Sequence, residues 1–169
     1  EPAQVPFDQE TYLQQADEGC FVCRLVQGDP TLPRHHIVWR NDEAIAFLDR
    51  FPTVFGYTLV APTTHLEQVT GDFTLHQFLS FQRIVHAIAE AVRELLRPER
   101  VYVLSLGSQQ RNAHVHWHIV PCPPGMPISE QQCALIDRRK RGGLQLTDED
   151  GAMLATRIQD SLPAWIRDG

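Results

Sequence analysis

The sequence predicts a single α+β domain in which strands form one sheet and a long helix packs on it. Two segments favour this class. From His114 to Ile119, histidines alternate with large apolar residues, and a period of two is typical of a β-strand. From Asp72 to Arg97, apolar residues recur every three or four positions, which is typical of a helix. At 169 residues, the chain is long enough to bury one core.

The first part of the chain is expected to contain a loose lead-in, a short helix and three strands. Ile37, Val38 and Trp39 favour a strand, because β-branched and aromatic side chains suit a pleated surface. Turn residues separate this strand from the next one, and Pro62 should stop the third, because proline has no N–H to give to a ladder. The expected ranges are 1–9 for the lead-in, 11–16 for the helix, and 36–39, 44–48 and 55–61 for the strands.

The second part begins with the long helix, which Gly71 and Pro98 bracket. A strand and a polar loop then lead to the histidine strand, which Pro121 should end for the same reason as Pro62. Thr147, with Asp150 three residues later, resembles a capping box and should begin a last helix. The expected ranges are 72–97 for the long helix, 100–106 and 114–120 for the strands, 107–113 for the loop and 148–161 for the last helix.

Composition favours one soluble globular domain over residues 1–169. Apolar residues make up 43% and charged residues 21%, which argues against disorder. The net charge of −6 argues against a stable nucleic-acid partner or a membrane surface, and no run approaches the roughly 18 apolar residues of a membrane span. The N-terminus lacks the basic and apolar regions of a secretory signal, and the four cysteines form no dense disulfide pattern. A cytoplasmic protein is therefore expected.

The histidine segment is the main candidate for chemistry. Side chains on one face of a strand recur about every 7 Å, so His114, His116 and His118 should form a row with Val115, Trp117 and Ile119 buried behind it. Imidazole has an unperturbed pKa of about 6.5, and three of them can supply a nucleophile, a proton donor and a metal ligand or orienting group. The alternative is a polar edge that faces solvent.

Cys20 and Cys23 are a close thiol pair that could give two ligands to zinc. Such a site needs two more ligands from elsewhere in the chain, and His65, which follows the third strand, is a candidate. The alternatives are a redox pair, although no βαβ pattern follows it, and two small buried apolar residues.

Three further features could each have either a binding role or a purely structural role. Asp49, at the end of the second strand, could accept hydrogen bonds from a ribose diol or could cap a turn. The loop with Ser108, Gln110 and Arg111 offers donors and a positive charge that suit phosphate, or it is an ordinary polar hairpin. The basic run over 137–141 could gather the phosphates of a long substrate or be a solvated loop.

Together these features resemble the histidine-triad (HIT) family of nucleotide hydrolases and transferases over about 20–121, with 122–169 as a C-terminal extension. The segment from His114 to Ile119 is the most specific part, and Phe47-Leu48-Asp49 and the segment 56–65 support it. The chain departs from the family's pattern at Tyr57, where a histidine is common, and at Cys122, where arginine often follows Val-Pro.

The resemblance implies a fold, a partner and a metal. The fold is a five-stranded antiparallel sheet with the long helix packed on it, plus a C-terminal helix, commonly paired into a homodimer across the sheet. The metal is a structural zinc ion, with no organic cofactor. The implied ligands are those of the family's metal-binding branch: Cys20, Cys23, His65 and His114.

The resemblance also implies an activity. His116 would be the nucleophile and His118 a donor to the phosphate, while Asp49 would bind ribose and Ser108 and Gln110 would lie in the phosphate loop. The expected function is cleavage at the α-phosphate of dinucleoside polyphosphates or nucleoside phosphoramidates, with adenine as the expected base, through a covalent nucleotidyl-histidine. The alternatives are a nucleotide-sensing or protein-interaction module with little turnover, and a zinc-binding scaffold.

Overall fold

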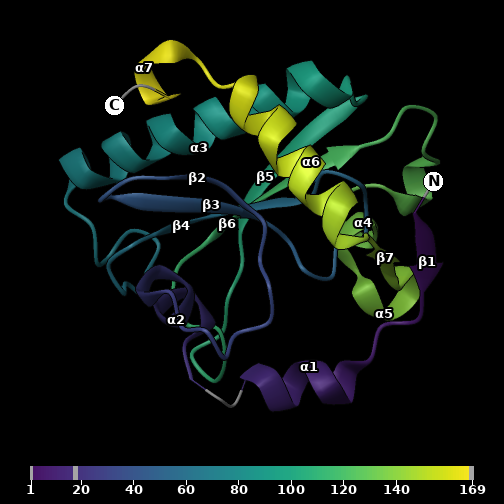
Figure 1. The fold of residues 1–169 in the computed structure, drawn as a ribbon, viewed down its shortest axis with the longest axis horizontal. Coiled ribbons are helices and arrows are strands. Elements are labelled where there is room, and N and C mark those ends of the chain that lie inside the picture. The colour runs from purple at the N-terminus through teal and green to yellow at the C-terminus, as the bar shows by residue number, and fades with distance from the viewer. Residues whose placement is uncertain (1, 17–18, 168–169) are drawn as a thin grey trace.

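The computed structural model describes residues 2–16 and 19–167, and its centre is one five-stranded antiparallel sheet (Figure 1). The strand order is β2-β3-β4-β6-β5, and every neighbouring pair is antiparallel. The strands are β2 (Ile37–Arg40), β3 (Ala44–Leu48), β4 (Thr58–Pro62), β5 (Arg100–Ser105) and β6 (Trp117–Cys122). The predicted α+β class with a five-stranded antiparallel sheet is therefore confirmed.

Helices cover both faces of this sheet. On one face lie the long helix α3 (Leu75–Leu96) and the C-terminal helix α6 (Asp148–Asp160), which cross it in Figure 1. The other face packs against α2 (Phe21–Gln27) through Val22 and Phe47. Because both faces are covered, every residue of β3, β4 and β6 is buried. The predicted long helix and last helix are both present: α3 begins three residues later and ends one residue earlier than predicted, and α6 ends one residue earlier.

The apolar residues of the histidine segment lie on the α3 face, as predicted. Val115, Trp117 and Ile119 belong to the larger core cluster, and the Trp117 ring lies 4.8 Å from that of Phe81, centroid to centroid. Thr74 begins α3 with a complete capping box that it shares with Gln77. The helix therefore holds this face of the segment against the core, and the histidines lie on the opposite side.

The predicted end of the histidine strand at Pro121 is wrong. β6 begins only at Trp117, so His114 and His116 precede it, and it continues through Pro121 to Cys122. Proline is tolerated here because the pairing of β4 with β6 ends at Ile119, so Pro121 has a strand partner on one side only, at Val101.

The third strand also begins later than predicted. Residues 53–57 form a turn, in which the backbone N–H of Tyr57 donates to the carbonyl of Val54 at 3.3 Å. Gly56 has a φ of +84°, which is incompatible with an extended strand and which glycine adopts without a steric cost. β4 therefore starts at Thr58.

The chain termini form structure that the sequence did not predict. The expected loose lead-in contains β1 (Ala3–Val5), which pairs with β7 (Gly143–Gln145) in a separate two-stranded antiparallel sheet. This sheet brings the N-terminal arm and its helix α1 (Gln9–Ala16) beside the C-terminal extension. The remaining short helices are η1 (Ile128–Glu130), α4 (Cys133–Ile136), α5 (Arg138–Arg141) and α7 (Ala164–Arg167). None of the described helices has the length and apolar content that crossing a bilayer requires.

Replacing Gly142 by alanine is expected to weaken the junction between the N-terminal arm and the extension. Gly142 has a φ of +73°, and a Cβ there would lie 2.2 Å from the backbone oxygen of Val5. Gly125 is a matched control, because its φ is +78° and a Cβ there would meet nothing within 4 Å. Both variants place alanine at a positive φ, which costs about 1–2 kcal/mol, but Gly142 also has a ψ of −162°, in a backbone region essentially restricted to glycine, so Gly142→Ala should lose a further ~1–3 kcal/mol from this strain and the clash.

Thermal melts of the two variants measure this difference. For a chain of this size 1 kcal/mol corresponds to about 2–4 °C in Tm, so Gly142→Ala should melt clearly below Gly125→Ala. Equal melting temperatures would mean that β1 does not hold this place in solution.

Candidate functional site

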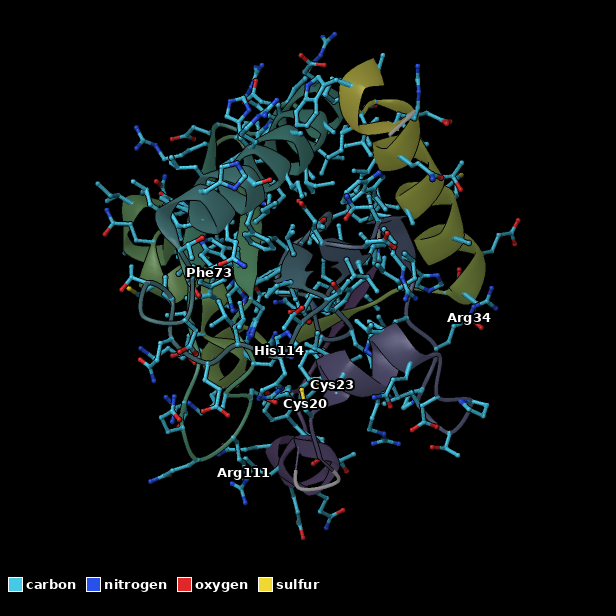
Figure 2. All side chains as sticks on the ribbon, turned by 90° about the vertical axis from the view of Figure 1, so that its left-hand side faces the viewer. Cys20, Cys23, Arg34, Phe73, Arg111 and His114 are labelled. Carbon is cyan, nitrogen blue, oxygen red and sulfur yellow. The ribbon has the colours of Figure 1, made fainter. Side chains whose placement is uncertain are left out.

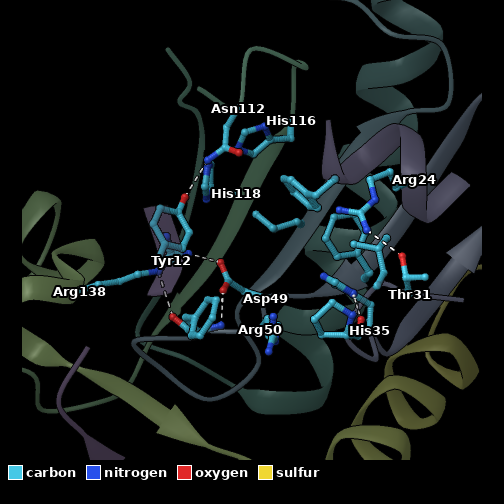
Figure 3. A pocket seen from close by; sticks show the side chains of 16 residues that line it. Tyr12, Arg24, Thr31, His35, Asp49, Arg50, Asn112, His116, His118 and Arg138 are labelled. Atoms are coloured by element: carbon cyan, nitrogen blue, oxygen red, sulfur yellow. Dashed lines mark hydrogen bonds and ion pairs between the residues drawn. The ribbon is translucent and has the colours of Figure 1, made fainter. Parts of the chain in front are cut away.

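Two of the three histidines open into a cavity of about 280 Å³ on the α2 face of the sheet (Figure 3). His116 and His118 line it, whereas His114 lies behind them and does not. The cavity walls come from segments far apart in the sequence, including Tyr12 of α1 and Arg138 of α5. All three histidines are buried, so the alternative of a polar edge that faces solvent is wrong.

His116 is held in one orientation by its own backbone. Its Nδ1 lies 2.7 Å from the carbonyl oxygen of His114, which can only accept a hydrogen bond. The ring hydrogen is therefore on Nδ1, and Nε2 has a free lone pair. Burial lowers the pKa of His116, which keeps the ring neutral. The hydroxyl of Ser105 donates to the His116 carbonyl at 2.8 Å and fixes the backbone of the segment as well.

His118 is paired on one side and unpaired on the other. Its Nδ1 lies 2.9 Å from the hydroxyl of Tyr57, and its Nε2 is buried with no hydrogen-bond partner among the described residues. Burial raises the pKa of Tyr57 and lowers the pKa of His118 to about 3, so the phenol stays protonated and the imidazole neutral. When Tyr57 donates to Nδ1, the ring hydrogen is on Nε2, and His118 offers a donor to whatever fills the cavity.

The opposite wall of the cavity is aromatic. The rings of Phe21 and His35 lie 6.2 Å apart, centroid to centroid, with only 16° between their planes. Phe47 meets both of them edge to face. Burial lowers the pKa of His35, so this ring is neutral as well. Flat apolar surfaces of this kind suit a planar heterocycle such as a nucleobase.

Asp49 lies at the cavity, but both of its carboxylate oxygens are already engaged. Oδ1 accepts the backbone N–H of Phe51 at 2.7 Å, which is the turn cap that the sequence allowed. Oδ2 forms an ion pair with Nη2 of Arg138. The Asp49 side chain is 2% exposed and that of Arg138 is 21% exposed. The ribose contact expected of Asp49 stays a prediction.

The two predicted phosphate-loop residues lie outside the cavity. Gln110 borders a neighbouring hollow beside Cys20 and His114, and the Ser108 hydroxyl accepts the Gln110 backbone N–H at 3.2 Å. The residue of this loop that reaches the cavity is Asn112, whose amide donates to the hydroxyl of Tyr12 at 2.8 Å. The contact of Ser108 and Gln110 with phosphate therefore stays a prediction, and it requires the loop to move.

Cys20, Cys23, His65 and His114 lie together beside the cavity, and Figure 2 shows both cysteines next to His114. Their four ligand atoms all lie within 4.8 Å of one another. Cys20 Sγ and Cys23 Sγ lie 3.4 Å and 3.6 Å from Nδ1 of His114, and Cys23 Sγ lies 3.2 Å from Nδ1 of His65. The structure therefore brings together the complete ligand set that the sequence predicted.

The chemistry of these four residues fits a tetrahedral zinc ion. Bonds of about 2.3 Å to sulfur and about 2.0 Å to nitrogen place sulfur and nitrogen roughly 3.6 Å apart, close to the observed separations. Nε2 of His114 lies 2.8 Å from the carbonyl of Pro62, and Nε2 of His65 lies 3.1 Å from a carboxylate oxygen of Glu67. Both oxygens accept a hydrogen, so each ring keeps a lone pair on Nδ1, the nitrogen that faces the sulfurs.

Burial changes the pKa of Cys23 and the pKa of His114 in opposite directions. Burial, with Cys20 as a hydrogen-bonding neighbour, raises the pKa of Cys23 to about 11, and burial lowers the pKa of His114 to about 4. A thiol with a raised pKa ionises when a cation binds, because metal and proton compete for the same sulfur. The neutral imidazole of His114 is already in the form that a metal requires.

Sequence reasoning missed several residues that line the cavity. Tyr12 and His35 had no signal in the sequence, whereas Asn112 belongs to the polar loop over 107–113 that the sequence offered for phosphate. Arg138 had a signal, since it belongs to the basic run over 137–141 that the sequence offered as a collector of phosphates. Tyr57 does not line the cavity but pairs with His118, and it also had a signal, because it replaces a histidine that is common in the HIT family.

A comparison with protein-family models matches residues 32–124 to the HIT domain. Among curated proteins, the chain is 34% identical over 110 residues to an uncharacterised HIT-like protein of Saccharolobus solfataricus, covering 60% of this chain and 73% of that protein. It is 28% identical over 129 residues to adenosine 5′-monophosphoramidase of Schizosaccharomyces pombe, covering 68% of this chain and 90% of that protein.

Among solved structures, a hypothetical histidine triad nucleotide-binding protein from Sulfolobus tokodaii aligns with a TM-score of 0.66 at 20% identity, covering 84% of this chain and 91% of that chain. A Zn-bound histidine triad family protein from Mycobacterium smegmatis aligns with a TM-score of 0.61 at 21% identity, covering 85% and 93%. At these identities the two structures support the fold alone.

Proposed function

Because the chain belongs to the HIT domain family, we propose that it is a nucleotide hydrolase or nucleotidyltransferase that reacts at the α-phosphate of its substrate. The observation that carries the proposal is the orientation of His116. Its Nδ1 donates to the His114 carbonyl at 2.7 Å, so the lone pair of Nε2 is available at the cavity. A neutral imidazole with a fixed tautomer is a competent nucleophile.

The proposed reaction has two displacements. Nε2 of His116 attacks the α-phosphorus, a P–N bond forms, and the bond from phosphorus to the leaving group breaks. Water or another acceptor then attacks the same phosphorus and releases His116. Covalent catalysis of this kind replaces one difficult displacement with two easier ones.

His118 is proposed to stabilise the phosphate during both displacements. Its Nε2 is buried and has no partner among the described residues, and with Tyr57 donating to Nδ1 it carries the hydrogen. A preorganised donor in a site shielded from water stabilises the charge that develops on the phosphate oxygens. Ser108 and Gln110 are proposed as further donors once their loop closes on a substrate.

The proposed substrates are nucleoside phosphoramidates or dinucleoside polyphosphates with an adenine base. The relative from Schizosaccharomyces pombe is an adenosine 5′-monophosphoramidase, which favours a phosphoramidate. The aromatic wall of Phe21, His35 and Phe47 would hold the base. Three arginines on the cavity wall suit a substrate with more than one phosphate.

We further propose that Cys20, Cys23, His65 and His114 hold a structural zinc ion, as the Zn-bound neighbour from Mycobacterium smegmatis suggests. Four protein ligands leave no coordination position for water, so the ion would act as a cross-link and take no part in the reaction. It would tie α2 to the start of the histidine segment and so hold the backbone carbonyl of His114 that orients His116.

The family also supports two proposals about the state of the protein. A homodimer would pair across the edge strand β5, on which Val103 is 47% exposed. The free thiols of the cysteine pair fit a reducing cytoplasm.

A panel of nucleotides tests the proposed function. Adenosine 5′-phosphoramidate and two diadenosine polyphosphates are incubated with the protein, with and without inorganic phosphate, and products are separated by chromatography. Release of AMP, or of ADP when phosphate is the acceptor, is the expected result. Binding of AMP by calorimetry without turnover of any compound would favour the alternative, a nucleotide-sensing module.

A further inference from the structure

We propose that Arg138, from the C-terminal extension, binds a phosphate oxyanion of the nucleotide, and that Asp49 is the positioning residue that orients it. The inference rests on the proposed nucleotide function and assigns a substrate contact to a residue outside the matched domain of residues 32–124.

Arg138 is fixed from several sides. Its Nε donates to the carbonyl of Phe51 at 3.0 Å, and its Nη2 pairs with Asp49 (Figure 3). Its guanidinium carbon lies 5.7 Å from the ring centroid of Tyr12 and 6.0 Å from that of Phe7. These contacts hold the guanidinium plane in place before any ligand arrives, and a preorganised donor loses little entropy on binding.

The exposed member of the ion pair is the arginine. The Asp49 side chain is 2% exposed, and each of its oxygens already accepts a hydrogen bond. The Arg138 side chain is 21% exposed and lines the cavity. Its two hydrogen bonds to described residues use two of the five N–H groups of a guanidinium, so three donors remain. A ligand in the cavity therefore meets N–H donors at this wall, which an anionic oxygen satisfies.

The charge of the cavity supports the same conclusion. The chain as a whole has a net charge of −6, but the cavity is lined by Arg24, Arg50 and Arg138 and by one carboxylate, Asp49. Guanidinium groups match the geometry of phosphate oxygens and form charge-assisted hydrogen bonds with them. A nucleotide offers this oxyanion from two sources: its 5′-phosphate, or a phosphate on the ribose.

The competing explanation is that Arg138 only holds α5 and the N-terminal arm against the body of the protein. Its contacts with Phe51, Tyr12 and Phe7 certainly contribute to that. If the role of Arg138 is purely structural, its replacement should lower the stability of the protein and weaken the binding of all ligands alike. If Arg138 binds phosphate, its replacement should weaken the binding of phosphorylated ligands and leave the binding of adenosine unchanged. This difference distinguishes the two explanations.

The test measures dissociation constants by calorimetry for adenosine, AMP, 2′-deoxy-AMP and adenosine 3′,5′-bisphosphate. The proteins are wild type, Arg138→Gln, Arg138→Lys and the matched control Arg139→Gln, whose arginine is 74% exposed and whose nearest carboxylate is Asp137. The double variant Asp49→Asn/Arg138→Gln removes both charges, so that no buried carboxylate is left without a partner.

In Arg138→Gln and in the double variant, affinity for a phosphorylated ligand should fall about tenfold or more, because a charged hydrogen bond is lost. Adenosine should bind as to wild type, Arg138→Lys should recover part of the loss, and Arg139→Gln should show none. A loss already seen with AMP identifies the 5′-phosphate, and a loss confined to the bisphosphate identifies the ribose phosphate. In the nucleotide panel, kcat should change less than KM.

Three results would overturn the proposal. The first is an equal loss for adenosine and for the phosphorylated ligands, which would make Arg138 structural. The second is a wild-type preference for AMP over 2′-deoxy-AMP that survives in Arg138→Gln and disappears in the double variant Asp49→Asn/Arg138→Gln, which would make Asp49 the ribose contact. Turnover of the panel with unchanged binding in Arg138→Gln would reject this inference and leave the proposed function standing.

Discussion

Replacing His116 by alanine is expected to lower turnover of the preferred nucleotide by about 10⁴-fold or more, because the group that we propose as the nucleophile is lost. Binding of AMP should change little, since the aromatic wall and Arg138 remain. The measurement is the initial rate of AMP release, together with a nucleotide-trapping experiment. Radiolabelled substrate quenched in alkali should leave label on wild-type protein and none on His116→Ala.

The fold should survive this substitution. The only hydrogen bond of the His116 ring among the described residues is to the carbonyl of His114, two residues away. His86→Ala is a suitable control, because His86 is an exposed residue of α3. The variant His116→Gly should regain part of the turnover when free imidazole is added. Turnover of His116→Ala at the wild-type rate would reject the proposed reaction.

Removal of the proposed zinc ion is expected to destabilise the protein strongly. A ligand that binds only the folded state at 1,000 times its Kd contributes about 4 kcal/mol, and for a chain of this size 1 kcal/mol corresponds to about 2–4 °C. Chelation should therefore lower Tm by about 8–16 °C, and added zinc should restore it. Mass spectrometry of the native protein should give one zinc ion per chain.

The cysteines of the chain provide a matched pair of variants. Cys23→Ser removes a predicted ligand, whereas Cys133→Ser changes an exposed cysteine outside the cluster. Cys23→Ser should lose the zinc ion and melt at the temperature of the chelated wild type, and Cys133→Ser should keep both the ion and the Tm. A wild-type protein purified without chelator that holds no metal, and whose Tm does not respond to zinc, would contradict the structural metal site.

Local sequence patterns predicted most of the sheet and its long helix. Short runs of apolar, β-favouring residues placed β2, β3 and β5 within one residue, and the three- to four-residue repeat placed α3, because the buried stripe of a helix has a fixed period. The same patterns failed where the existence or the limits of a strand depend on the strand beside it. Pro121 is inside β6 because β4 no longer pairs beside it, and β1 exists only because β7 lies next to it.

For the site, the sequence by itself determined the reactive groups: the spacing of His114, His116 and His118, and the close pair of Cys20 and Cys23. Only the tertiary structure decided that His118 meets Tyr57 and that Asp49 meets Arg138 across 89 residues of chain. The physical reason is that a period along the chain sets the face of an element on which a side chain lies. The partner that the side chain meets depends on how distant elements pack together.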